Sequence, residues 1–203
     1  MSMRVEQDGR VRRLTLAAPA RRNVLDSGLA AALLNELRDA QADSATGAIL
    51  VDAEGPVFCG GLDSSESVPQ QVFNFGRQAS KPIVVAVQGV AVSAGVALIA
   101  NAHVAVAAQG SSFGLIDIRE GRCHPGILGA VTAAIGRRRA VELSLTGRVF
   151  TAPEALAWGL LHAVAPPFEL DDRASAIAAA LGNADPGAVA AILEFYRLPA
   201  DSV

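Results

Sequence analysis

Two short stretches of this sequence each join the end of an apolar strand to a small-residue turn and then to the start of a helix. The first turn contains Gly60 and Gly61, in AEGPVFCGGLDSSE, and the second contains Ser93, Ala94 and Gly95, in KPIVVAVQGVAVSAGVALIANAH. A helix start leaves backbone N–H groups without intrahelical partners and carries a partial positive charge. Together the two turns could hold one oxyanion, although glycine is also common in ordinary tight turns.

The composition favours one packed domain that does not bind polyanions. The chain has 203 residues, of which 51% are hydrophobic, and its 17 basic and 20 acidic residues leave a net charge of -3. These values predict a single domain and exclude a nucleic-acid surface. Cys59 and Cys123 are too few for a disulfide framework and lack metal-ligand spacing. The charged start, MSMRVEQDGRVRRL, differs from a signal peptide, so we expect a cytoplasmic protein with no membrane segment and no metal site.

Strands and helices alternate along the chain, which predicts the α/β class with mainly parallel strand pairing. Asp8-Gly9 is typical of a hairpin turn, and Asp26 precedes leucines at helical spacing. Thr151 and Glu154 form a capping-box pattern. We expect residues 112–126 to be irregular. Helices are expected at about 27–42, 69–79, 127–135, 137–145, 170–181 and 186–196, and strands at 47–53 and 160–165, with a strand, turn, helix and strand within 83–108.

Five motifs occur in an order and spacing that resemble the enoyl-CoA hydratase/isomerase family, also called the crotonase superfamily. They are RNVL (22–25), PVFCGGLD (56–63), KPIVVAVQGVAVSAGVAL (81–98), SSFGLIDIREG (111–121) and AVELSLTGRVFTAPEALAWGLLHAVAP (140–166). The resemblance implies a ClpP/crotonase-type fold of repeated ββα units with C-terminal helices and a short C-terminus. It implies one domain, with a core over about 1–165 and a shortened helical part over about 166–203, assembled as a homotrimer or hexamer.

The resemblance also implies a site for an acyl-CoA thioester, with coenzyme A bound as part of the substrate and no permanent cofactor. In the family two backbone N–H groups bind the thioester oxygen, and by position they belong here to Leu62 and Ala94. Removing an α-proton from a thioester places negative charge on that oxygen, so fixed donors stabilise the enolate more than the ground state.

Other residues of the same motifs match the family's contacts with the nucleotide part of coenzyme A. We expect Asp63 and Glu66 also to cap the short helix behind the first turn. Arg21 and Arg22 could instead lie on the solvated surface without contacting coenzyme A. The matching positions are Arg21, Arg22, Val24, Leu25, Gly60, Gly61 and Asp63.

The acidic residues depart from the family pattern. Family hydratases carry two glutamates, one after the glycine turn and one after F-G, and these positions hold Ala97 and Asp117 here. Adding water to a double bond needs one group to activate the water while a proton reaches the α-carbon. We therefore expect isomerase or lyase chemistry rather than hydration, with Asp117 as the single acidic base. Glu120 and His124 are further catalytic candidates that also fit ordinary structural roles.

Two functions of other classes stay open at this stage. Clp-type serine peptidases have a related fold with a serine at a comparable turn, so Ser93 could be a nucleophile with His103 or His124 as its base. Alternatively, the chain binds acyl-CoA without turning it over. Ala97, the short segment 64–80 and the short C-terminus would then reflect lost catalysis.

Overall fold

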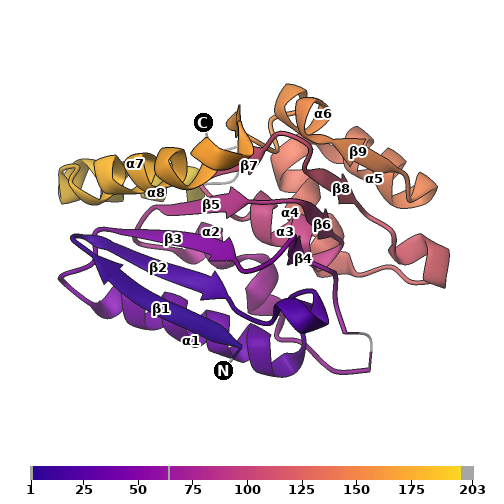
Figure 1. Cartoon of the computed structure of the whole chain (residues 1–203), viewed down its shortest axis with the longest axis horizontal. Helices are drawn as coiled ribbons and strands as arrows, with labels where there is room; N and C mark the ends of the chain where they lie inside the picture. The colour runs from indigo at the N-terminus through magenta and orange to yellow at the C-terminus, as the bar shows by residue number, and fades with distance from the viewer. Residues whose placement is uncertain (1, 64, 198–203) are drawn as a thin grey trace.

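The computed structural model describes residues 2–63 and 65–197 and folds them into two β-sheets with helices packed around them (Figure 1). The chain repeats a strand–strand–helix pattern, as expected for this α/β class. The first repeats are β1 (Met3–Asp8), β2 (Val11–Leu16) and α1 (Ser27–Ala42); β3 (Ala48–Ala53), β4 (Val57–Cys59), η2 (Gln70–Phe73) and α2 (Phe75–Gln78); β5 (Ile83–Val87), β6 (Val90–Val92) and α3 (Ala94–Ala100); and β7 (Val104–Ala108), β8 (Ser112–Gly114), η3 (Asp117–Glu120) and α4 (Pro125–Ile135).

The remaining elements follow the last repeat. They are α5 (Arg137–Thr146), β9 (Val149–Thr151), α6 (Ala152–Ala157), β10 (Ala163–Ala165), η4 (Pro167–Glu169), α7 (Leu170–Gly182) and α8 (Pro186–Arg197), with η1 (Pro19–Arg21) near the N-terminus. Figure 1 shows the larger sheet on the left and the smaller one, with α4, α5 and α6, on the right.

The six-stranded sheet has the order β1-β2-β3-β5-β7-β10. β1 and β2 form the predicted antiparallel hairpin, in which Asp8 pairs with Val11. Gly9 adopts a φ of +53° in its turn, a conformation that glycine accepts at low cost. The other strands of this sheet pair in parallel, which confirms the prediction of mainly parallel pairing.

Both faces of this sheet are covered. Along β3, Ile49 and Val51 face the larger core with α1 and α3, whereas Leu50 faces a second core with α7. A parallel strand buried on both faces reads as a continuous apolar run. Burial on both faces of the sheet therefore explains why residues 48–51 are all apolar.

α1 begins where the sequence predicts. The Asp26 carboxylate accepts a hydrogen bond from the Leu29 N–H at 2.7 Å and caps the helix. The Glu66 carboxylate also serves this helix, because it accepts from the Ser27 N–H at 2.8 Å. The expectation that Glu66 caps the helix after its own turn is therefore wrong. The buried face of α1 includes Leu29, Leu33 and Leu37.

The four-stranded sheet has the order β4-β6-β8-β9. β4, β6 and β8 run parallel, and β9 pairs with β8 in the antiparallel sense. The expectation of an irregular segment at 112–126 is wrong in part, because Ser112–Gly114 forms β8 and Asp117–Glu120 forms η3. A three-residue strand is too short to show hydrophobic alternation, so periodicity does not reveal it.

The C-terminal helices lie where the sequence predicts them, and α7 packs Ala174 and Ala178 against the larger sheet. Residues 198–203 of the expected C-terminal part lie outside the described residues. Across residues 2–63 and 65–197, no single helix is long and apolar enough to cross a membrane, although the bent pair Pro167–Gly182 and Pro186–Arg197 together reaches that length and composition.

A large-to-small substitution tests how much the smaller sheet depends on its aromatic core. Phe150 on β9 is fully buried and stacks on Phe113 of β8, with ring centroids 5.4 Å apart. We expect Phe150→Ala to lower the free energy of unfolding by about 3–5 kcal/mol in urea denaturation, through lost burial and a residual cavity. Phe168 is 82% exposed, so Phe168→Ala should change it by about 0.5 kcal/mol or less. Equal losses in the two variants would contradict this packing.

Candidate active site

The two small-residue turns lie next to each other because the strands that precede them are neighbours. β4 and β6 run parallel, with Cys59 opposite Ala91. β6 and β8 are also parallel, and the Ser93 N–H donates to the Gly114 carbonyl at 2.8 Å. Parallel strands end at one edge of a sheet, which is where ligands bind in open α/β sheets. The loops after β4, β6 and β8 therefore meet at one edge.

The first two of these loops are in direct backbone contact. A Cβ atom on Gly95 would lie 2.8 Å from the Cys59 carbonyl oxygen, and one on Gly61 would lie 3.7 Å from Cγ2 of Val92. Gly61 also has a φ of +115°, which residues with side chains rarely adopt. These two glycines are therefore required by the close approach and by the backbone conformation.

Each turn contains a backbone N–H group that has no hydrogen-bond partner among residues 2–63 and 65–197. α3 begins at Ala94, and its first intrahelical bond is made by the Ala97 N–H to the Ser93 carbonyl at 3.1 Å. Neither the Leu62 nor the Ala94 N–H donates a hydrogen bond to any residue in 2–63 or 65–197. Ser93, just before Ala94, has a φ of +47°, an uncommon conformation for a non-glycine residue. Both N–H groups thus lack a hydrogen-bond partner among the described residues, and Ala94 is fully buried.

The segment 21–25 runs alongside the first turn. The Gly60 N–H donates to the Arg22 carbonyl at 2.8 Å, and the Leu25 N–H donates to the Gly61 carbonyl at 2.9 Å. The Asp63 N–H returns to the Leu25 carbonyl at 3.0 Å. The residues predicted to contact coenzyme A therefore lie on two backbone segments, 21–25 and 60–63, that are hydrogen-bonded side by side and form one strip.

Two charged side chains of this strip make local contacts. The Arg21 guanidinium pairs with the Asp26 carboxylate. The Asp63 carboxylate accepts from the Ser65 hydroxyl and N–H at 2.7 and 2.9 Å, and these bonds lower the pKa of Asp63. Asp63 therefore stabilises its own turn as an ionised carboxylate and, like Glu66, does not cap the following helix.

Asn23 is a residue whose role the sequence reasoning missed. Its Nδ2 donates to the carbonyls of Glu54 and Val57 at 3.0 and 2.8 Å, and its Oδ1 accepts from the Ala18 N–H at 2.8 Å. The side chain is fully buried, and a buried amide with these bonds fixes the loop that carries it. The signal was present in RNVL, because an asparagine next to apolar residues must satisfy its amide when buried.

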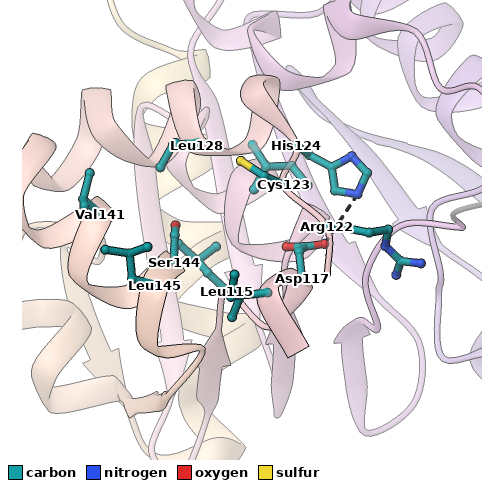
Figure 2. Close-up of a pocket in the computed structure, with 11 residues that line it drawn as sticks. Leu115, Asp117, Arg122, Cys123, His124, Leu128, Val141, Ser144 and Leu145 are labelled. Carbon is teal, nitrogen blue, oxygen red and sulfur yellow. Dashed lines mark ion pairs between the residues drawn. The ribbon is translucent and has the colours of Figure 1, made fainter. Parts of the chain in front are cut away.

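The third loop carries the acidic candidate into an apolar cavity (Figure 2). Asp117 begins η3, His124 directly precedes α4, and Nε2 of His124 lies 3.6 Å from Oδ1 of Asp117. Both side chains line a cavity of about 150 Å³, a volume that holds benzene in an engineered apolar cavity. The rest of its wall is mainly apolar, with Leu115, Ile118, Ile127, Leu128, Val141 and Leu145.

The other acidic positions do not line this cavity. Glu120 lies in η3 with Asp117, but its side chain is 56% exposed and pairs with Arg122. Ala97, at the position of a hydratase glutamate, lies within α3 and has no exposed surface. The structure therefore brings Asp117 and His124 together and leaves Glu120 at the surface.

Other reactive side chains are engaged elsewhere. His103 lies beyond the far end of α3 from Ser93, roughly 10 Å or more along the helix axis. Its Nδ1 accepts from the Ile83 N–H at 2.9 Å, so it is not placed as a base for Ser93. Burial raises the pKa of the Cys59 thiol to about 11, which keeps it protonated. Within the described ranges, no group of three or more His, Cys, Asp or Glu side chains is placed to hold a metal ion.

Comparison with known proteins decides the family. The family model described as enoyl-CoA hydratase/isomerase matches residues 6–202. The chain belongs to this enoyl-CoA hydratase/isomerase family. It is 32% identical over 212 residues to the rat protein "Enoyl-CoA hydratase domain-containing protein 3, mitochondrial", covering 97% of this chain and 70% of that one. It is 29% identical to the 2,3-dehydroadipyl-CoA hydratase of Escherichia coli (strain K12), covering 95% and 80%.

Solved structures with enoyl-CoA hydratase names have the same fold as this family member. Human enoyl Coenzyme A hydratase domain-containing protein 3 superposes with a TM-score of 0.91 at 27% identity, covering 100% of this chain and 87% of that one. A probable enoyl-CoA hydratase/isomerase from Mycobacterium abscessus gives 0.90 at 30% identity, covering 98% and 82%. The predicted crotonase-type fold is thus confirmed. The chain spans 60% to 70% of the length of the mitochondrial relatives.

The contact between the first two loops leads to a prediction about Gly95. Gly95→Ala places a methyl group against the Cys59 carbonyl, so we expect the free energy of unfolding to fall by about 1–3 kcal/mol. Gly129 in α4 is the matched control, because no atom lies within 4 Å of a Cβ there. Gly129→Ala should raise the stability by about 0.5–1 kcal/mol in the same urea experiment. A neutral Gly95→Ala would show that the loops are not in backbone contact.

Proposed function

We propose that this family member acts on acyl-CoA thioesters by forming an enolate. The observation that carries the proposal is the meeting of three loops at one sheet edge. Two of them present the unpaired N–H groups of Leu62 and Ala94, and the third presents the Asp117 carboxylate. Fixed N–H donors stabilise charge that develops on a thioester oxygen, and each such donor typically contributes about 100- to 1000-fold in rate.

Asp117 serves as the proton-transferring group in this proposal. It takes the proton from C2 of a 3-enoyl thioester, and the electrons of the broken C–H bond move onto the thioester oxygen. When Asp117 returns the proton to C4, the double bond moves to C2=C3 and the carboxylate is restored. His124 lies 3.6 Å from Asp117 and positions that carboxylate. A single base completes this cycle, because the same group removes and returns the proton.

The acidic residues favour isomerase or lyase chemistry over hydration. Named relatives include hydratases, but the position of the first hydratase glutamate is the fully buried Ala97. That same alanine also supports a second candidate, a homologue that binds acyl-CoA without catalysis. Coenzyme A enters as part of the substrate, with no resident cofactor. A single-domain homotrimer or hexamer in the cytoplasm completes the proposal, and the assembly state can be measured by sedimentation.

Substitution of Asp117 separates the enzyme from the non-catalytic binder. We expect Asp117→Asn to slow exchange of the α-proton of an acyl-CoA thioester in deuterated water by about 100- to 10,000-fold, because the amide cannot accept the proton. Glu120→Gln is the control, since Glu120 is at the surface and should retain the wild-type rate. Exchange by Asp117→Asn at the wild-type rate would remove Asp117 from the mechanism, and no exchange by the wild type would favour the binder.

A second measurement tests the preference against hydration. We expect the wild-type protein to shift the double bond of a 3-enoyl-CoA at least about 100-fold faster than it hydrates crotonyl-CoA, since no second carboxylate among the described residues lines the cavity beside Asp117. Chromatographic separation of isomerised and hydrated products gives both rates. Hydration at the faster rate would show that another group, such as His124, activates water.

A further inference from the structure

The side chain of His103, which lies between α3 and β7, connects β5 to the C-terminal helix α8. Its Nδ1 accepts from the Ile83 N–H of β5 at 2.9 Å. Its ring makes an edge contact with Tyr196 of α8, with ring centroids 5.4 Å apart. We propose that His103 is a pH-sensitive latch, which holds α8 in place when it is neutral and releases the helix when it takes up a proton. This role is independent of the proposed chemistry.

α8 is held at few points, so the loss of one contact can release it. All of its residues are described, and Leu193 is the buried one, whereas Ile192 and Phe195 are 67% and 58% exposed. The other anchors are at its C-terminal end. Tyr196 contacts the imidazole, and Arg197 donates to two carbonyls at the end of α2 at 2.7 and 3.5 Å. A helix with so little burial opens locally at a low free-energy cost.

The site of His103 fits the neutral ring. Because Nδ1 accepts the Ile83 N–H, it carries no proton, and the neutral ring has its proton on Nε2. A proton on Nδ1 would place two N–H groups against each other and break that bond. Nε2 is buried without a well-aligned hydrogen bond in the described part of the chain. Burial is the largest effect on His103 and lowers its pKa, although the nearby Gly76 backbone acts in the opposite direction.

The charged groups around His103 also oppose a further positive charge. Arg197 of α8 lowers the pKa of the ring by like-charge repulsion. From α2, Arg77 donates to the Arg197 carbonyl at 3.3 Å, and Lys81, just before β5, donates to a carbonyl near the end of α1 at 2.8 Å. Within the described ranges, no carboxylate offsets these cations at the ring. A protonated His103 therefore needs water, which it reaches when the ring turns outward and displaces Tyr196.

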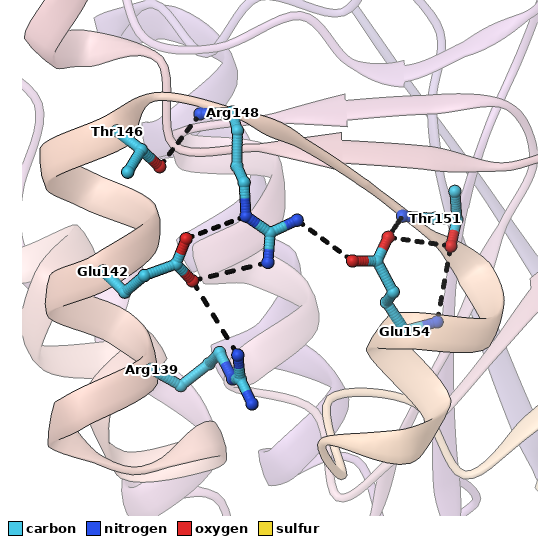
Figure 3. Close-up of polar contacts among 6 residues, drawn as sticks. All are labelled: Arg139, Glu142, Thr146, Arg148, Thr151 and Glu154. Atoms are coloured by element: carbon cyan, nitrogen blue, oxygen red, sulfur yellow. Dashed lines mark hydrogen bonds and ion pairs between the residues drawn. The ribbon is translucent and has the colours of Figure 1, made fainter.

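The contacts that hold α5 and α6 do not change over the same pH range. The Arg148 guanidinium donates from Nε to Glu142 of α5 at 2.8 Å and from Nη1 to Glu154 of α6 at 3.0 Å (Figure 3). Thr151 and Glu154 form the predicted capping box, whose hydrogen bonds lower the pKa of Glu154. Since arginine keeps its charge and Glu154 stays ionised from about pH 7 to about pH 5.5, the response to acid should be confined to α8.

Hydrogen exchange on the full chain tests the latch. Because the pKa of His103 is lowered only while α8 is in place, the latch is closed above about pH 6.5 and weakens as the pH falls below it, by at most about tenfold per pH unit. We expect the protection factors of the α8 amides, corrected for intrinsic exchange rates, to fall about four- to eightfold between about pH 7 and about pH 5.5. Those of α7 should stay constant. Equal protection of α8 at the two pH values would overturn the proposal.

A pair of histidine variants separates protonation from packing. In His103→Asn the amide oxygen can still accept from the Ile83 N–H but does not titrate, so α8 should be protected equally at both pH values. His162→Asn is the matched control. Nδ1 of His162 also accepts a backbone N–H, that of Ala105 at 3.0 Å, but the residue is exposed and precedes β10. This control should keep the wild-type response, and the same response in His103→Asn would contradict the latch.

The reverse coupling gives an independent measurement, because linkage between two equilibria is reciprocal. If protonation of His103 displaces Tyr196, removing the Tyr196 ring must make protonation easier. We expect Tyr196→Ala to raise the pKa of His103 toward its ordinary value of about 6.5 in an NMR titration. The chain has three histidines, so their ring resonances can be assigned by substitution. Phe195→Ala is the control and should leave this pKa unchanged. An unchanged pKa in Tyr196→Ala would show that α8 and His103 are not coupled.

Discussion

The close approach of Gly95 to the Cys59 carbonyl is the constraint on which the candidate site depends. It lets the turn after β6 lie directly against the end of β4, so that the N–H groups of Leu62 and Ala94 belong to adjacent loops. Any larger residue at 95 must push these loops apart. Since an oxyanion site needs donors fixed before the reaction begins, the backbone packing of the smaller sheet and the proposed chemistry have the same structural cause.

Sequence patterns predicted the long elements of the fold because those elements repeat a period several times. α1 repeats buried apolar residues at helical spacing from Leu29 to Ala40, and β3 is apolar on both faces. β8 has three residues, and its identity as a strand comes from pairing with β6 and β9. The same limit applies to Glu66, because its partner, Ser27, is 39 positions away in the chain. Local sequence patterns do not reveal contacts between residues that are so far apart in the chain.

The candidate site likewise has a part that local sequence patterns predict and a part that they do not. The motifs around Leu62, Ala94 and Asp117 follow strand ends, and neighbouring parallel strands then bring those ends to one edge. The apolar wall could not be predicted, because Leu128 and Leu145 belong to different helices and meet only through the packing of α4 on α5. The 3.6 Å approach of His124 to Asp117 depends on how the loop after η3 returns to α4. Motif spacing identifies candidates, and helix packing decides which of them share a cavity.

Position 97 in α3 holds a buried alanine and no carboxylate. Ala97 is fully buried in the larger core, and a glutamate there would have to displace apolar neighbours and lose its hydration. The described residues that line the cavity beside Asp117 include one carboxylate, that of Asp117, and one imidazole, that of His124. A lone base can remove a proton and return it, but activating water in the same step would require a second group in contact with that water. Within the proposed function, this is the physical reason for preferring reactions in which the proton removed is also the proton delivered.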